Sequence, residues 1–364
     1  MELNKEILWI SIIIGLLIKY SYIEKGIENI MSITIKDIAK LANVSHTTVS
    51  RALNNSPLIN EETKIRIKAI AEELNYVPNY SAKSLVLDRS YTIGVFFSSI
   101  VQGTSPNFFF QSIRGINSSI EEKYNIVIRG IDSYKDFSTI NNKRFDGIIL
   151  MSQCDSDNEF IYHVKKQNIP LIVLDREMEE KSLINIISDD EEGSFTATEC
   201  LIKNGHNDIG IIVGRDGFKS AKRRQEGFMK ALIKYKIPIN SDYIVRGEYD
   251  MKSGYSAMKK LIDLPKRPTG VFCSNDDMAI GAIKAIFDSN LKVPQDISIV
   301  GFDDVEFSGY STPALTTVKR PIEQISIIAG QKLIDTINSG VYEGEKIYIK
   351  TDIVLRDSVL NLNK

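Results

Sequence analysis

Side chains that can bind a sugar stand at the ends of apolar runs in this 364-residue chain. Asp175 ends the run PLIVLD, and Asn275 and Asp303 follow the runs GVFCS and ISIVGF. Arg224 lies in SAKRRQEGF, where a helix is expected to begin. Carboxylates, amides and a guanidinium can pair with neighbouring hydroxyl groups, while an aromatic ring packs on the C–H face of a sugar. The set predicts a polyol-binding site, with two candidate aromatic residues: Tyr249 and Phe110.

Simpler explanations exist for each of these residues. A carboxylate or amide after a strand often caps the helix that follows, as Asp276 could before MAIGAIKAI. Asp303 and Asp304 could be imagined as an acid–base pair, but adjacent residues of one loop rarely face each other across a substrate. An enzyme built from α/β lobes, such as a sugar kinase or dehydrogenase, would need a phosphate-binding loop, and the sequence has no GxGxxG after the first strand and no GxxxxGK[ST]. We therefore expect no catalytic residues.

Cysteine and histidine are too few and too scattered to predict a metal site. The three cysteines, Cys154, Cys200 and Cys273, form no C-x-x-C pair, and the chain has only three histidines. Each cysteine has apolar neighbours, so buried, reduced thiols are expected, and with them a cytoplasmic location. No metal and no cofactor is predicted.

The elements that must hold the polar side chains indicate two α/β lobes. From Tyr91 onward, apolar runs alternate with helical stretches, beginning with TIGVFF (Thr92–Phe97) and a helix around Phe109–Lys123. NIVIRG, DGIILM and PLIVLD complete a first set, and DIGIIVG, YIVRG, GVFCSN and ISIVGF form a second. Apolar strands that alternate with helices indicate doubly wound parallel sheets covered on both faces. Such sheets bind ligands at the carboxyl ends of their strands, so the cleft between the lobes is the expected site.

Three short helices are predicted ahead of this core, between residues 34 and 74. Thr34 and Asp37 have capping-box spacing at the start of the first helix. Ser45 can cap the second helix and Asn60 the third. Two short helices joined by a turn of about four residues form a helix-turn-helix. The sequence therefore predicts a small all-α headpiece before the α/β core.

The second of these helices presents side chains suited to base edges and phosphates in a major groove. Arg51 is the strongest candidate, as a guanine reader or a phosphate clamp. The same pattern would fit a three-helix packing module with solvated polar positions. The candidate DNA contacts on this helix are Ser45, His46, Thr47, Ser50 and Arg51.

Two runs in this region resemble the DNA-binding headpiece of the lactose/galactose repressor (LacI/GalR) family of transcriptional regulators. They are TIKDIAKLANVSHTTVSRALNN and TKIRIKAIAEELNYVPNYSAKSL, and the segment from Asn75 to Leu85 is the most specific part. In that family this segment is a hinge that folds into a short helix on operator DNA, which implies that Leu85 enters a minor-groove step. The hinge residues expected to contact DNA are Asn79, Ala82, Lys83 and Leu85.

The resemblance continues through the core to about Val359. It is carried by SPNFFFQSIRGI, SDDEEG, KNGHNDIGII, NDDMAIGA, VPQDISIVGFDD and PALTTVKRP. It implies a periplasmic-binding-protein-like core that binds a small sugar or sugar derivative between its lobes. The residues at the family's effector-contacting positions are Asp175, Arg224, Asn275 and Asp303, with Tyr249 as an aromatic that packs on the ligand.

The function implied by the resemblance is sequence-specific control of transcription, as a repressor of carbohydrate-utilisation genes. A change in the angle between the lobes would alter the spacing of two hinges in a homodimer on a pseudo-palindromic operator. Residues 33–89 carry eight Lys or Arg and six Asp or Glu, so their net charge is only weakly positive. Such a charge fits a small DNA-contacting surface that is present on each subunit of a dimer. After LRDSV only LNLNK remains, which leaves no room for the heptad helices of tetrameric relatives, so a dimer is expected.

Residues 1–30 do not fit this pattern. Ile7–Ile18 is almost entirely apolar, but its twelve residues fall short of the roughly 20 that span a bilayer. Met31 stands just before the headpiece, so one interpretation is translated upstream sequence from a mis-assigned start. The other is a membrane anchor or interfacial helix, and the alternative function is then a membrane-tethered or exported sugar-binding receptor. The expected domains are 1–30 for the apolar extension, 32–78 for the helix-turn-helix domain, 79–90 for the hinge and 91–364 for the two-lobed core.

Overall fold

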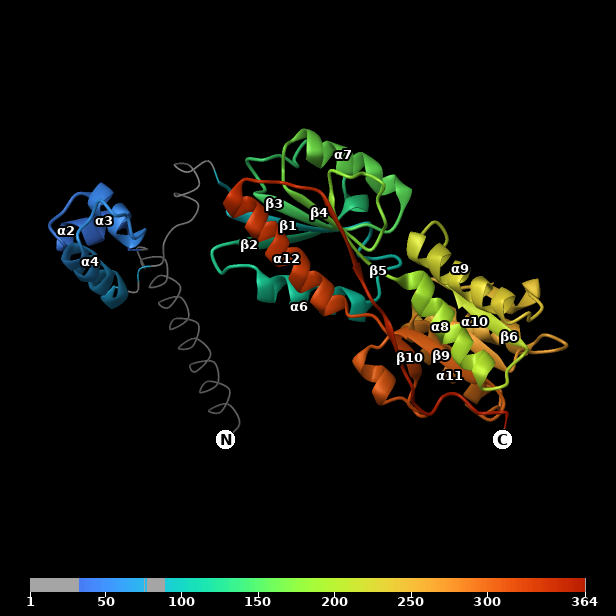
Figure 1. Cartoon of the computed structure of the whole chain (residues 1–364). Helices are drawn as coiled ribbons and strands as arrows, with labels where there is room; N and C mark the ends of the chain where they lie inside the picture. Colours follow the sequence, from blue (N-terminus) through green and yellow to red (C-terminus); the bar gives the residue numbers. More distant parts are fainter. Residues whose placement is uncertain (1–32, 75, 77–88, 364) are drawn as a thin grey trace, which may run out of the picture. The chain divides into compact units, whose positions relative to one another are not determined.

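The computed structural model describes residues 33–74, 76 and 89–363. The chain divides into two compact units, Met1–Ala82 and Lys83–Lys364 (Figure 1). Within the described ranges, no helix is both long enough and apolar enough to cross a membrane. The extension 1–30 lies outside these ranges, as does most of the hinge, including four candidate DNA contacts: Asn79, Ala82, Lys83 and Leu85.

The described part of the first unit contains helices α2 (Ile35–Leu41), α3 (His46–Leu53) and α4 (Glu61–Glu73). Each begins at its expected cap. Asp37 accepts hydrogen bonds from the backbone N–H and the hydroxyl of Thr34, at 2.9 and 2.7 Å. Ser45 accepts one from the third residue of its helix at 3.1 Å, and Asn60 does the same at 2.8 Å. These bonds satisfy backbone donors that a helix start leaves unpaired.

A small apolar core joins the three helices. Ala39 of α2 and Val49 of α3 are both buried in it, and Ile67 of α4 completes it. The small side chain of Ala39 lets α2 and α3 approach closely. Between them Asn43 has a positive φ of 51°, which asparagine tolerates better than most residues. The predicted helix-turn-helix is therefore present.

The first lobe of the core is a parallel sheet in the order β11-β5-β4-β3-β1-β2. Helices α6 (Pro106–Ser119) and α12 (Ile322–Ser339) pack together on one face, and α7 (Asn158–Lys166) covers the other (Figure 1). Central strands with helices on both faces are fully buried, which explains their continuous apolar sequences. The strands are β1 (Thr92–Phe97), β2 (Asn125–Gly130), β3 (Gly147–Met151), β4 (Leu171–Leu174), β5 (Ile184–Ser188) and β11 (Glu345–Ile349).

The second lobe repeats this plan with the order β12-β10-β9-β8-β6-β7, in which only the short edge strand β12 is antiparallel to its neighbour. Helices α8 (Asp190–Lys203) and α9 (Lys219–Lys234) lie on one face, and α10 (Met251–Ile262) and α11 (Asp276–Asp288) lie on the other. The strands are β6 (Ile209–Val213), β7 (Ile244–Arg246), β8 (Gly270–Cys273), β9 (Ser298–Asp303), β10 (Thr316–Lys319) and β12 (Asp352–Val354).

The chain crosses between the lobes three times. It leaves the first lobe between β5 and α8, returns between β10 and α12, and leaves again between β11 and β12. Each lobe is therefore built from stretches that are far apart in the sequence.

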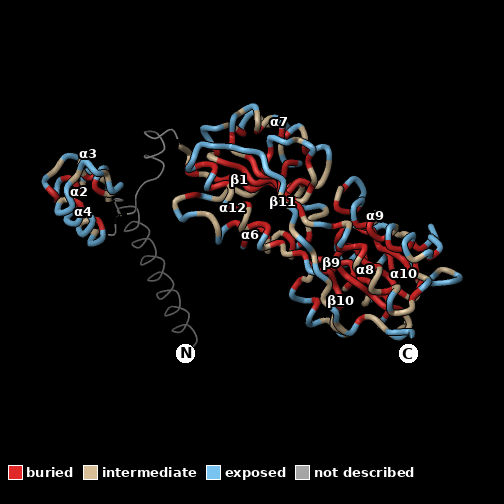
Figure 2. Tube along the Cα trace, viewed as in Figure 1, coloured by how far each residue is buried: buried red, intermediate tan, exposed pale blue. Residues whose placement is uncertain are grey.

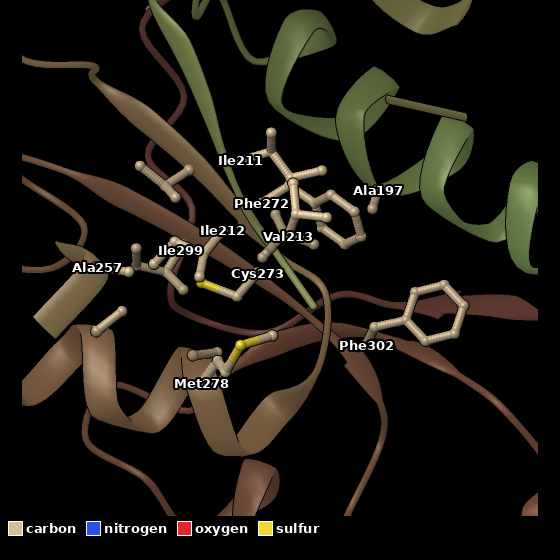
Figure 3. Packing of buried hydrophobic residues seen from close by; sticks show 14 of the residues in the cluster. Ala197, Ile211, Ile212, Val213, Ala257, Phe272, Cys273, Met278, Ile299 and Phe302 are labelled. Atoms are coloured by element: carbon tan, nitrogen blue, oxygen red, sulfur yellow. The ribbon is translucent and has the colours of Figure 1, made fainter. Parts of the chain in front are cut away.

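The core of the second lobe shows how each strand serves both faces of its sheet. Figure 3 places Ile211 and Phe272 toward Ala197 of α8, whereas Ile212 and Cys273 point to the opposite face, where α10 and α11 lie. Buried residues concentrate in the strands of both lobes, and exposed residues lie on the outer faces of the helices (Figure 2). The polar residues that follow the strands are thus held on a rigid base.

Candidate effector site and DNA-reading helix

A small cavity lies between the two lobes. Its walls come from segments that follow the carboxyl ends of seven strands, β1, β3 and β6–β10, as expected for parallel sheets. Its volume is about 30 Å³, whereas an engineered apolar cavity that binds benzene has a volume of about 150 Å³. The lining residues are Gly103, Ser105, Phe108, Gln153, Phe218, Ser220, Arg224, Tyr249, Asn275, Asp303 and Arg320.

Arg224 is held in the cavity wall by close packing of α9 on α8. Gly227, one turn later, lies against the backbone of Glu191, and a Cβ there would stand 2.0 Å from that carbonyl oxygen. Arg224 Nε is 3.2 Å from Asp190 Oδ2, and its Cζ is 3.8 Å from the centroid of the Phe302 ring. Burial opposes the charge, but nearby carboxylates outweigh it and raise the pKa of Arg224. The guanidinium is therefore a fixed cation.

Arg320 supplies a second buried cation from the crossover between β10 and α12. Its guanidinium donates to Asp175 of the first lobe and, at 2.9 Å, to the hydroxyl of Ser188. Its Cζ lies 5.4 Å from the centroid of the Phe108 ring. The side chain of Asp175 is 4% exposed and is not among the lining residues; burial raises its pKa, and Arg320 opposes that rise. Asp175 therefore positions a cavity-lining side chain.

Asp303 ends β9 and carries an unsatisfied oxygen in the cavity wall. The residue is 6% exposed, and its Oδ1 accepts no hydrogen bond from any described residue. Arg224 Nη2 and Arg320 Nη1 lie 3.6 and 3.9 Å from that oxygen, beyond hydrogen-bonding distance. Burial raises the pKa of Asp303 to about 6. A buried acceptor without a donor is costly, and a ligand hydroxyl can supply the donor.

Hydrogen bonds cross the cavity from one lobe to the other through Gln153. Its Nε2 donates to Asp175 at 3.2 Å, and its Oε1 accepts from the hydroxyl of Ser220 at 3.2 Å. The Ser220 oxygen is in turn 3.0 Å from the hydroxyl of Tyr249. This relay connects a residue of the first lobe to an aromatic side chain of the second.

Asn275 combines a structural role with a place in the cavity wall. It accepts a hydrogen bond from the N–H of Met278 at 2.9 Å, which caps α11, and donates to the backbone oxygen of Tyr249 at 3.0 Å. Asp276, the capping candidate of the sequence, instead accepts hydrogen bonds from the hydroxyls of Ser308 and Thr317. Asn275 therefore caps the helix that follows its strand, and it also lines the cavity.

Three of the predicted site residues have unusual backbone conformations. Asp175, Tyr249 and Asp303 have φ values of 71°, 65° and 113°, in the region that favours glycine. Non-glycine residues with such strain concentrate at binding and catalytic sites, because the surrounding structure must hold them there. The strain in this cluster supports a functional role for it.

Phe110 does not reach the cavity, and its prediction as the packing aromatic is corrected to Phe108. Phe110 is 62% exposed on α6, whereas Phe108 is buried and lines the cavity. Residues two positions apart on an α-helix point about 200° apart, so only one of them can face inward. The sequence had placed both in the run SPNFFF and could not fix the rotation of the helix.

Sequence reasoning missed seven lining residues. Gln153 and Arg320 are the most informative of them, because both bond to Asp175. Arg320 lies in the run PALTTVKRP, but only the crossover brings that run to the cavity. The lining residues that were not predicted are Gly103, Ser105, Phe108, Gln153, Phe218, Ser220 and Arg320.

The second helix of the headpiece exposes most of its candidate DNA contacts. Ser45, His46, Thr47 and Arg51 are exposed, and Ser50 is half-buried. The guanidinium of Arg51 has no hydrogen-bond or ion-pair partner among the described residues. Its fork of donors is thus available to a base edge or a phosphate.

Comparisons with known proteins decide the family. Residues 34–79 match the family of bacterial regulatory proteins of the lacI type, and residues 198–359 match the periplasmic binding protein-like domain. Over 330 residues the chain is 56% identical to the probable HTH-type transcriptional repressor ExuR of Bacillus subtilis (strain 168), which covers 91% of this chain and 99% of that protein. The chain belongs to the lacI family of bacterial regulatory proteins. This lacI-family protein is a DNA-binding transcriptional repressor with a sugar-binding effector domain, and it is not an enzyme.

Two solved structures resemble this lacI-family repressor over most of its length. The lac repressor dimer bound to operator and the anti-inducer ONPF is 26% identical, with a TM-score of 0.77 over 90% of this chain and 99% of that one. The complex of the transcriptional regulator CelR with cellobiose is 25% identical, with a TM-score of 0.68 over 90% and 99%. The predicted fold, a helix-turn-helix headpiece and a two-lobed parallel-sheet core, is confirmed.

Proposed function

We propose that this repressor is controlled by a small sugar bound in the cavity between its lobes, and that it binds operator DNA as a homodimer. The sugar contacts Arg224, Tyr249, Asn275 and Asp303 in the second lobe, and Phe108 takes the packing role first given to Phe110. Asp175 acts through Arg320 and Gln153. The relatives that support this are those whose structures hold cellobiose or an operator.

One observation supports the effector site most directly, the unsatisfied oxygen of Asp303. It is buried between two guanidinium groups and faces the cavity, so a ligand hydroxyl would complete its hydrogen bonding. The rings of Phe108 and Tyr249 also line the cavity and offer apolar faces to the C–H side of a sugar.

The size of the cavity links binding to regulation. About 30 Å³ cannot hold a sugar ring, so the lobes must part or their side chains must rearrange when the effector enters. Sugar binding then favours one arrangement of the lobes, and only this difference in affinity can change DNA binding. In the sequence the hinge, residues 79–90, lies between the core and the headpiece at 32–78, so it transmits the change in the lobes to the headpiece.

Two guanidinium nitrogens determine which sugars the test must include. Arg224 Nη2 and Arg320 Nη1 both face Asp303 without forming a hydrogen bond to it. A hydroxyl can bind to Asp303, and a carboxylate on the sugar can pair with both nitrogens. The panel of effectors therefore contains sugar acids as well as neutral mono- and disaccharides.

An exposed aromatic surface on the core supports the homodimer. Phe110 on α6 and Phe307 and Tyr310 around η4 (Glu306–Gly309) are 62%, 63% and 80% exposed. The two segments are close, because both lie near Arg114. Its Cζ is 5.6 Å from the centroid of the Phe110 ring. Its pKa is raised by Glu323 and, at longer range, by Glu306 of η4. Aromatic side chains are enriched at protein interfaces. We place the partner subunit there.

The test measures operator binding and its response to sugars. A fluorescent duplex from the protein's own upstream region is titrated at fixed salt, with and without each sugar of the panel. We expect one sugar to shift the affinity at least about tenfold, a coupling of about 1.4 kcal/mol. Asp303→Asn should abolish that shift and keep operator binding, whereas the exposed Asp335→Asn on α12 should change neither. The proposed site would be refuted if both variants kept the response to sugar, or if no sugar altered operator binding.

A further inference from the structure

The first turns of α9 send side chains in two directions. Arg224 faces the cavity, while Lys219 and Arg223, four residues apart and therefore on one face of the helix, reach the first lobe. Lys219 Nζ is 2.6 Å from Asp155 Oδ2, and Arg223 Nη2 is 2.5 Å from Glu177 Oε2. Asp155 follows β3 and Glu177 follows β4, so both ion pairs join the two lobes beside the cavity.

Glu177 is held in place independently of α9. The hydroxyl of Tyr348 donates to its carboxylate at 2.7 Å, and Lys346 Nζ lies 3.1 Å away, both from β11 of the same lobe. The hydrogen bond from Tyr348 contributes most to a lowered pKa of about 2 for Glu177. The carboxylate therefore stays ionised and oriented when Arg223 leaves it, ready to bind that guanidinium again.

The segment after β3 is also fixed beneath α9. The backbone N–H of Lys219 donates to the carbonyl of Gln153 at 2.8 Å. Cys154, the next residue, is half-buried and packs against the hydrophobic core of the second lobe. Separation of the lobes would break this bond and remove the second lobe from the Cys154 side chain.

We propose that the pairs Lys219–Asp155 and Arg223–Glu177 form a latch that holds the lobes together, and that its release admits the sugar. This inference rests on the proposed function, because the cavity of about 30 Å³ must enlarge for a sugar. The pairs are partly exposed, so each is weak and is screened by salt. A weak latch suits a cleft that opens repeatedly.

Labelling of Cys154 tests the latch without any sugar. The full-length protein is treated with iodoacetamide, and alkylation of each cysteine is followed by mass spectrometry, with Cys200 of α8 as an internal reference. We expect Glu177→Gln to speed labelling of Cys154 by up to about fivefold, which corresponds to 1 kcal/mol. The matched control is Glu180→Gln, because Glu180 lies in the same segment and pairs with Lys165 and Ser182 of its own lobe. The control should label at the wild-type rate.

Two further measurements make the result specific. Cys154 should be labelled at the same rate in Arg223→Gln as in Glu177→Gln. The double variant should be labelled no faster than either, because both substitutions remove the same interaction between the lobes. Higher salt should speed labelling of the wild type, and should speed labelling of Glu177→Gln less, because that variant keeps only the Lys219–Asp155 pair. Equal Cys154 rates in wild type and Glu177→Gln would overturn the latch. If no sugar alters operator binding, the labelling result still stands, so the failure of the two proposals can be told apart.

Discussion

Asp276 is a buried carboxylate whose protonation should make the stability of this repressor depend on pH. Burial raises the pKa of Asp276 to about 7, although the backbone N–H of Val305 and two hydroxyls donate to it. Protonated Asp276 stabilises the folded state. This contribution is fully present below the pKa of about 4 that the residue has in the unfolded chain, and it is lost as the pH rises through 7. We expect the thermal midpoint to fall between pH 5.5 and 7.5, and to fall less in Asp276→Asn. The exposed Asp357→Asn should keep the wild-type slope, and equal slopes in all three proteins would contradict the assignment.

Arg51 is the residue on which DNA recognition should depend most. Its guanidinium on α3 has no partner among the residues that the structure describes and can pair with a guanine or a phosphate, so Arg51→Ala should weaken operator binding by about 1–3 kcal/mol. Arg66→Ala removes the same charge from the exposed face of α4 and is expected to cost less. Anisotropy titrations on the operator and on a scrambled duplex measure both effects. If Arg51 reads a base, its variant loses preference for the operator; an equal loss on both duplexes would mean a phosphate contact.

Among the elements, α8 and α9 pack closely because Gly227 has no side chain, and this packing positions Arg224. Gly227→Ala would put a Cβ 2.0 Å from the carbonyl oxygen of Glu191, so the two helices must separate. We expect a loss of about 1–3 kcal/mol in the free energy of unfolding, and a weaker response to sugar because Arg224 moves with α9. Gly309→Ala is the control, since a Cβ there meets no atom within 4 Å. Urea denaturation compares the variants, and equal midpoints would show that the contact can relax.

The strands that could be predicted from the sequence were those with continuous apolar runs. TIGVFF and DGIILM sit in the middle of a sheet with helices on both faces, and their sequences record that burial. The edge strands β11, EKIYI, and β12, DIV, were not predicted, and neither were the interior strands β5, INIIS, and β10, TTVK. Each of these strands is short, and none carries an apolar run longer than three residues. Helix α6 begins earlier than expected, since Ser105 caps it.

At the scale of the whole molecule, the exposed aromatic residues predict assembly. Phe307→Asp places a charge in the proposed partner surface, so we expect sedimentation velocity to show monomers and operator affinity to fall. Phe287→Asp on α11 is the matched control, because Phe287 is also exposed, at 72%. A dimer that survives Phe307→Asp would move the interface elsewhere on the core.

The candidate site could be predicted in part, for a reason that concerns the whole chain. Arg224, Tyr249, Asn275 and Asp303 follow strands of the second lobe, and the rule that ligands bind at strand ends was enough to find them. Arg320 and Gln153 come to the cavity through the crossover and the contact between lobes, which no local pattern records. Phe108 and Phe110 differ only in helix rotation, and both fit the same apolar run.

The three crossovers also determine the order in which the protein can mature on the ribosome. The headpiece is contained in the first quarter of the chain and can fold as soon as it emerges, whereas the first lobe waits for α12 and β11, which are among the last elements to be made. Domains generally fold as units during synthesis, from the N-terminus onward. A truncated or nascent chain therefore has a DNA-reading helix but lacks part of its sugar-responsive core. Such fragments would contact DNA without control by sugar, so rapid completion or removal of the chain protects regulation.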